Sequence, residues 1–154
     1  LAVNYRQELL KRMPENFLSS AGEDLSKCLL DSSTVSLYKN FGAKLHDVED
    51  GGVFGAIWEI CERENVGCEV DIRNIPIKQV TVEICEYFDI NPYTLRGDGA
   101  CLAIVEDVPE AVKFGRVIGR ITKDKARVVT MGEEKRFLEP NRVDDYFNIK
   151  KKED

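Results

Sequence analysis

The chain has 154 residues, which is the size of one domain and is enough to bury a hydrophobic core. Hydrophobic residues make up 43% of it and charged residues 32%, a balance that excludes a disordered chain and a fibrous repeat. The net charge of −6 argues against a general nucleic-acid binder, because affinity for the phosphate backbone comes from clustered Lys and Arg.

The first third of the chain reads as helical. Apolar periodicity predicts a helix over residues 1–13, and Pro14 marks the start of a second helix over residues 15–25. A short apolar run over residues 28–30 favours a buried strand. Ser32, Ser33 and Thr34 offer an N-cap for a helix over residues 35–41, which Gly42 should end.

A strand, a polar turn and a helix follow in close succession over residues 43–61. Ala43, Leu45 and Val48 indicate the end of a buried strand, and two glycines close the turn that follows. The next residues recur at helical spacing, with one apolar face made by Val53, Ile57, Ile60 and Cys61. A helix that packs on a sheet is therefore predicted here.

The rest of the chain alternates strands and helices. Residues 68–72 alternate as a half-buried strand does, and residues 79–88 have helical spacing. The continuous apolar run over residues 100–105 indicates a central strand, and a short helix follows at 108–114. Three strands at 117–122, 126–130 and 135–138 should form a meander. The prediction is an α/β fold: one mixed sheet of about five to seven strands with packed helices.

Several features bear on the environment of the protein. No apolar run approaches the roughly 20 residues of a membrane span and no signal peptide is visible, so we expect a cytoplasmic protein. The five cysteines lie in apolar patterns without a C-x-x-C pair, which favours buried free thiols. Because the chain starts at Leu1 rather than Met, we expect a fragment whose native beginning lies upstream.

The turn before the helix at residue 53 is the main candidate site. Asp47, Glu49 and Asp50 bring three carboxylates within four positions. Asp47 or Asp50 could simply cap the helix, but a cap needs only one carboxylate. The unpaired N–H groups and the dipole of a helix start favour an anion, and Gly51 and Gly52 would let it approach the backbone. Clustered carboxylates beside such a helix end fit a Mg²⁺–phosphate complex.

Two further residues are weaker candidates. Asp98 lies between two glycines just before the apolar run at residue 100, either as a second polar site or, as we prefer, as part of a plain turn. His46 is the only histidine, and a structural hydrogen-bonding role is favoured over acid–base catalysis because no nucleophile pattern accompanies it.

The run over residues 46–55, His-Asp-Val-Glu-Asp-Gly-Gly-Val-Phe-Gly, resembles the signature of the C-terminal domain of the aminoimidazole ribonucleotide synthetase (PurM) superfamily. That superfamily includes HypE, selenide water dikinase and thiamine monophosphate kinase, and its pathways include purine biosynthesis and hydrogenase maturation. The resemblance extends to the segments at residues 9–18, 67–77 and 98–103, and HypE-like proteins are the most similar.

The resemblance implies an ATP-dependent enzyme of which this chain is a part. Residues 1–140 would be its C-terminal domain, and residues 141–154 a C-terminal segment and polar tail. An N-terminal ATP-binding domain, absent here, would bind most of the ATP and form a homodimer. This chain would close the cleft on a small-molecule substrate, activating a carbonyl-type or phosphate oxygen.

Individual roles also follow from the resemblance. Asp47 and Asp50 would hold Mg²⁺, while Gly51 and Gly52, with Glu49 and Asp98, would contact phosphate or substrate. Two departures keep the substrate open: residues 139–147 lack the tail Cys of HypE, and Glu49 replaces a Ser found in thiamine monophosphate kinase. The competing interpretation is a non-catalytic domain that binds an anion or a protein partner.

Overall fold

The fold is described from a computed structural model of the chain. The residues it describes are 1–22, 32–40, 42–106, 109, 112–113, 115–141 and 143–149. The predicted strand at 28–30 lies outside them, as does most of the predicted helix at 108–114.

Six strands, five α-helices and two 3-10 helices make up the regular structure of the described residues. In chain order the elements are α1 Arg6–Leu9, α2 Glu15–Gly22, α3 Ser32–Asn40, β1 Lys44–Asp47, α4 Gly52–Arg63, β2 Gly67–Asp71, the 3-10 helix η1 Ile72–Asn74, α5 Gln79–Phe88, β3 Cys101–Ile104, β4 Gly119–Thr122, β5 Arg127–Met131, β6 Glu134–Phe137 and the 3-10 helix η2 Asp145–Asn148.

The helix predictions are confirmed for α2, α4 and α5, and α1 is shorter than the predicted helix over residues 1–13. At the end of α3, Gly42 has a φ of +68° and the Ala43 N–H donates to the Tyr38 carbonyl at 3.0 Å, which is the predicted glycine-terminated end. The predicted start of α3 is wrong: the helix begins at Ser32, so the expected cap residues already lie in its first turn.

The strands form two sheets instead of the single sheet predicted. The smaller sheet pairs β1 with β3 in antiparallel fashion, and the larger is mixed, in the order β4-β2-β5-β6. The prediction that residues 100–105 form a central strand is therefore wrong, since β3 belongs to a two-stranded sheet. The predicted meander is wrong between β4 and β5, because β2 lies between them and pairs parallel to β5. Only its last hairpin, β5 with β6, is confirmed.

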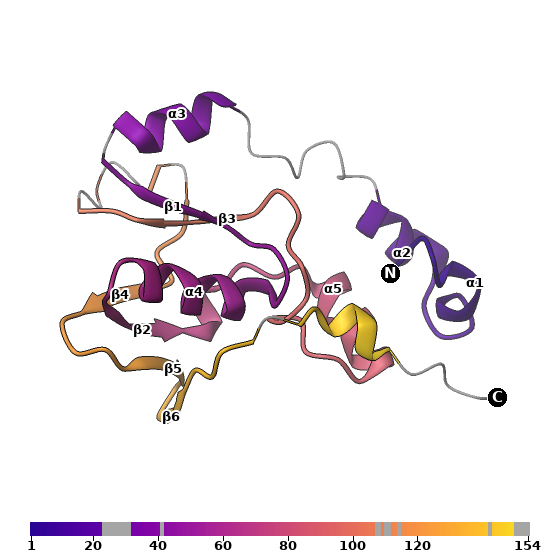
Figure 1. Cartoon of the computed structure of the whole chain (residues 1–154). Coiled ribbons are helices and arrows are strands. Elements are labelled where there is room, and N and C mark those ends of the chain that lie inside the picture. Colours follow the sequence, from indigo (N-terminus) through magenta and orange to yellow (C-terminus); the bar gives the residue numbers. More distant parts are fainter. Residues whose placement is uncertain are drawn as a thin grey trace.

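Helix α4 lies between the two sheets and joins them into one core (Figure 1). Its predicted apolar face is confirmed: Ile57, Ile60 and Cys61 are each at most 3% exposed. They pack with Val70 of β2 and Val129 of β5, and the core extends to residues of β3. Because both sheets cover this helix, its start is held at a fixed place between them.

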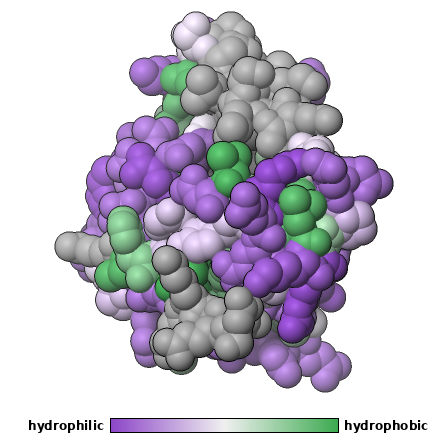
Figure 2. Space-filling model, turned by 90° about the vertical axis from the view of Figure 1, so that its right-hand side faces the viewer, coloured by the Kyte–Doolittle hydropathy of each residue, from purple (hydrophilic) through white to green (hydrophobic). Residues whose placement is uncertain are grey.

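A second, smaller cluster lies at the right of Figure 1, where α1, α2 and α5 meet. It buries Leu9, Leu18, Val80, Ile84 and Phe88. Figure 2 shows this side of the molecule, where hydrophilic residues dominate and apolar residues form small separate patches. In the described part of the chain, no helix has both the length and the apolar composition needed to cross a membrane.

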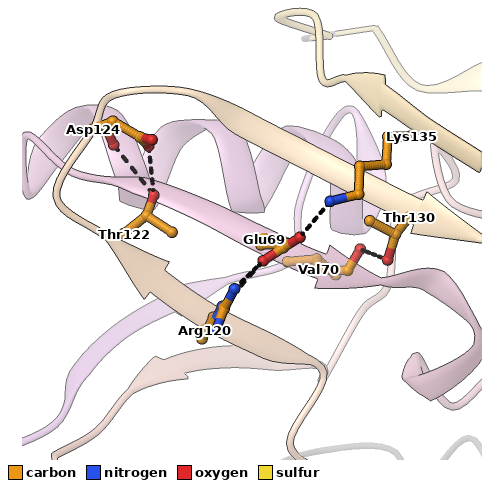
Figure 3. A network of polar contacts seen from close by, with 7 residues as sticks. All are labelled: Glu69, Val70, Arg120, Thr122, Asp124, Thr130 and Lys135. Atoms are coloured by element: carbon orange, nitrogen blue, oxygen red, sulfur yellow. Dashed lines mark hydrogen bonds and ion pairs between the residues drawn. The ribbon is translucent and has the colours of Figure 1, made fainter. Parts of the chain in front are cut away.

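The outer face of the larger sheet carries a chain of charges (Figure 3). Glu69 on β2 accepts hydrogen bonds from Arg120 on β4, at 2.6 Å from Nη2, and from Lys135 on β6, at 3.2 Å. Both bonds lower the pKa of the Glu69 carboxyl, and the bond from Arg120 has the larger effect. The face away from α4 is thus polar at its centre.

The described cysteines are free thiols, as predicted. Cys61, Cys68 and Cys85 are buried and Cys101 is half-buried. Burial is the main cause that raises the pKa of the Cys85 thiol, to about 11. Cys28 lies outside the described residues.

Candidate functional site

The loop from β1 to α4 is fixed at both of its ends. Val48 is buried, its N–H donates to the Ala100 carbonyl at 3.0 Å, and its carbonyl accepts from the Gly97 N–H at 3.2 Å. Helix α4 begins at Gly52, and its N-cap residue is Gly51, with a φ of +83° and no side-chain capping bond. The interpretation of Asp47 or Asp50 as a cap is therefore wrong, because a left-handed glycine occupies that position.

The backbone of residues 93–95 lies directly against the start of α4. The Phe54 N–H donates to the Tyr93 carbonyl at 3.1 Å, and the Gly52 N–H donates to the Glu49 carbonyl at 2.9 Å. Gly51 and Gly52 are both buried. Two of the N–H groups near the helix start thus have partners within the chain. Phosphate contact through Gly51 and Gly52 stays a prediction, and their observed role is to shape a tight turn.

Three of the predicted site carboxylates line one hollow of about 530 Å³. Asp47 and Glu49 reach it from the β1–α4 loop, and Asp98 reaches it from the turn before β3. The turn interpretation of Asp98 is also confirmed, since the Ala100 N–H donates to the Gly97 carbonyl at 2.8 Å. The hollow is completed by residues of α3, β1, α4 and β3 and of the loops after β1 and before β3, namely Val35, Lys39, Leu45, His46, Val48, Arg63, Arg96, Gly99, Ala100 and Cys101.

Arg96 connects the two carboxylate-bearing loops. Its Nε lies 2.6 Å from Asp98 Oδ1, and its Nη1 lies 3.3 Å from Asp50 Oδ1. The hydrogen bond and charge of Asp98, with a smaller effect of Asp50, raise the pKa of the Arg96 guanidinium. Sequence reasoning missed this residue, although its position two residues before Asp98 in a glycine-rich turn was visible.

His46 has the structural role that the sequence favoured. Its Nδ1 lies 3.2 Å from Arg63 Nη1 and its Nε2 lies 2.9 Å from Glu59 Oε2. Because a guanidinium can only donate, Nδ1 is the acceptor and Nε2–H donates to Glu59. The imidazole thus ties β1 to α4.

The described part of the C-terminal segment holds the loop that carries Arg96. The buried Asp144 accepts from the Arg96 N–H at 3.2 Å. Asp145 accepts from the Thr94 hydroxyl at 2.5 Å and from the Asn91 N–H at 3.2 Å. The sequence suggested a C-terminal segment and polar tail after residue 140, and nothing local in it indicated these contacts.

Replacing Asp145 with Asn should lower the free energy of unfolding by about 1–2 kcal/mol at pH 7, because charged hydrogen bonds are lost. Burial acts to raise the pKa of Asp145, but the hydrogen bonds from Thr94, Asn148 and Asn91 outweigh it and lower the pKa. A carboxylate with a lowered folded-state pKa stabilises above its unfolded pKa, about 3.9, and loses this contribution as the pH falls through the folded value. Urea unfolding from pH 7 to pH 3 should show the difference from the unmodified protein shrinking below about pH 4.

The control for this experiment is Asp89→Asn, at an exposed position with a φ of +55° that Asn tolerates. It should be close to neutral. If the Asp145→Asn variant has unchanged stability at pH 7, the hydrogen bonds of Asp145 do not stabilise the loop that carries Arg96.

The described residues include no group of three His, Cys, Asp or Glu side chains placed to hold a metal ion. Mg²⁺ often takes only one or two protein carboxylates and completes its shell with water and phosphate. The Arg96 guanidinium between Asp50 and Asp98 indicates that a cation fits there. The metal roles of Asp47 and Asp50 stay predictions.

Several solved structures match the fold of this chain. Thiamine-monophosphate kinase from Stenotrophomonas maltophilia matches with a TM-score of 0.59 and 22% identity, over 86% of this chain and 46% of that protein. AaThiL complexed with AMPPCP and TMP matches with a TM-score of 0.58 and 19% identity, over 89% and 46%. HypE in complex with ATP matches with a TM-score of 0.55 and 20% identity, over 62% and 34%. The chain shares their fold.

The resemblance drawn from the residues is thereby confirmed at the level of the fold, since HypE and thiamine-monophosphate kinase are members of the superfamily it named. No protein-family model and no curated protein sequence matches the chain. The chain spans between 34% and 46% of the length of these three solved proteins.

Proposed function

We propose that this chain is the C-terminal, cleft-closing part of an ATP-dependent enzyme related to aminoimidazole ribonucleotide synthetase. The observation that carries the proposal is the hollow that Asp47, Glu49, Arg96 and Asp98 line, with Arg96 also paired to Asp50. The comparisons support the proposal because the chain shares its fold with a HypE in complex with ATP and with AaThiL complexed with AMPPCP.

We assign different roles to the four carboxylates. Asp47 and Asp50 would hold Mg²⁺, which would neutralise phosphate charge when bound. Glu49 and Asp98 would face the substrate or the phosphate groups from two sides of the hollow. Gly51 and Gly52 would keep the loop in its tight turn and let the phosphate come close to it. The substrate would be a small molecule with a carbonyl-type or phosphate oxygen that ATP activates.

The proposal includes a second domain. An N-terminal domain of the same protein would bind most of the ATP and form the homodimer of a cytoplasmic enzyme. The share of the matched proteins that this chain covers, at most 46% in the three described, supports such a division. Phosphoryl transfer depends on positioning and charge neutralisation, which one side of an open cleft cannot supply.

The chain alone should therefore fold but bind ATP more weakly than a Kd of about 1 mM, and should not hydrolyse it. The full-length protein should do both in the presence of Mg²⁺. Circular dichroism would establish folding, and calorimetry and an ATPase assay on the two proteins side by side would establish binding and turnover. Tight ATP binding by the isolated chain would contradict the two-domain arrangement, and a full-length protein without nucleotide binding would favour the non-catalytic interpretation.

A further inference from the structure

We propose that Arg96 is a phosphate-binding residue of this site, and that its guanidinium leaves Asp50 and Asp98 for the nucleotide phosphates when the metal–nucleotide complex enters. The inference rests on the proposed function and adds a residue that the carboxylate pattern did not include. Arg96 then has two roles: it pairs with the carboxylates before the metal–nucleotide complex binds, and it contacts the phosphates afterwards.

The place of Arg96 supports both roles. Its side chain lines the same hollow as Asp47, Glu49 and Asp98. Its two ion pairs, at 2.6 Å and 3.3 Å, hold the carboxylates of two loops that are 46 or more residues apart along the chain. Without a cation between them, these like charges would repel one another. The guanidinium therefore offsets part of the repulsion between the two carboxylates.

The ion pairs of Arg96 can be exchanged at low cost. The side chains of Arg96, Asp50 and Asp98 are 45%, 59% and 76% exposed, so water competes for all three groups. Exposed ion pairs contribute little to stability. A divalent cation that takes Asp50 would therefore displace the guanidinium readily.

The backbone beneath Arg96 does not need to move in this exchange. The Arg96 N–H is held by Asp144, which is 6% exposed, and the next N–H, of Gly97, is held by the Val48 carbonyl. The long side chain is thus free to rotate on a fixed base. A planar guanidinium binds a phosphate through two parallel N–H donors, so the released group is suited to the anion that enters with the metal.

The test uses the full-length protein and the variants Arg96→Gln and Arg96→Lys. Mn²⁺ binding is followed by electron paramagnetic resonance, and Mg–AMPPCP binding by calorimetry. Arg96→Gln should bind Mn²⁺ several-fold more tightly, because the competing cation is gone, and should bind Mg–AMPPCP about tenfold more weakly. Arg96→Lys keeps the charge without the planar fork, so its Mn²⁺ affinity should stay near that of the unmodified protein while its nucleotide affinity falls.

The control is Arg73→Gln, which removes another exposed guanidinium that pairs with an Asp two residues away, Asp71. It should change neither affinity. If Arg96 only holds the loops together, its removal weakens both affinities, and if Arg96 lies apart from the site, neither changes. Either outcome overturns the inference and leaves the proposed function standing. An unmodified full-length protein that binds no Mg–AMPPCP overturns both.

Discussion

Replacing Asp47 and Asp50 together with Asn in the full-length protein should lower Mg²⁺-dependent ATP turnover by about a hundredfold or more, since the loss of a single preorganised electrostatic group already costs this much in other enzymes. The fold should persist, because both side chains are exposed and neither caps α4. Steady-state ATPase rates over a range of Mg²⁺ concentrations would measure the effect, with circular dichroism to verify folding.

The matched control replaces Glu133 and Glu134 with Gln. It removes the same number of exposed carboxylates at the β5–β6 hairpin and should leave turnover unchanged. Turnover that is equal in the Asp47/Asp50 variant and in this control would contradict the metal role of the two aspartates.

The largest expected effect on stability is at Gly52, where substitution by Ala should cost about 3 kcal/mol or more of the free energy of unfolding. Gly52 has a φ of +62°, and an added Cβ would lie 2.5 Å from the Leu95 carbonyl oxygen and 2.6 Å from that of Tyr93. Both are backbone atoms, and the Tyr93 carbonyl also accepts the Phe54 N–H at the start of α4, so this segment cannot move aside without opening the loop.

The Gly132→Ala variant separates the effect of the positive φ from the effect of the close contacts at Gly52. Gly132 has a φ of +65°, but an added Cβ there would meet no atom within 4 Å. Its substitution should therefore lower the free energy of unfolding only by the conformational strain, about 1–2 kcal/mol. Urea unfolding of both variants would compare them through their midpoints at equal m-values. If both variants lose the same free energy of unfolding, the close packing at Gly52 contributes nothing to the effect.

Local sequence patterns predicted α2, α4 and α5 and the turns that end α3 and join β5 to β6. The apolar face of α4, the glycine at the end of α3 and the hairpin from β5 to β6 each depend on residues a few positions apart. Helical spacing and left-handed glycines act over that distance, because the hydrogen bonds that they favour close within one turn. The acidic turn at residues 47–52 was also found in this way.

The division into two sheets was not predictable from such patterns. The apolar run over residues 100–105 shows that a strand is buried, but it carries no information on which strand lies beside it. The insertion of β2 between β4 and β5 is likewise a pairing between distant segments. Strand order depends on how α4 fills the space between the sheets, which is a property of the whole core.

The sequence by itself determined the α/β class, the strand–turn–helix unit and the carboxylates at its turn. Only the tertiary structure decided that Asp98 shares a hollow with Asp47 and Glu49, that Arg96 reaches Asp50, and that the buried Asp144 holds the backbone of Arg96. The Arg96–Asp50 and Arg96–Asp144 contacts join residues 46 and 48 positions apart. Contacts of this kind form only when packing brings distant loops together, so no local periodicity records them.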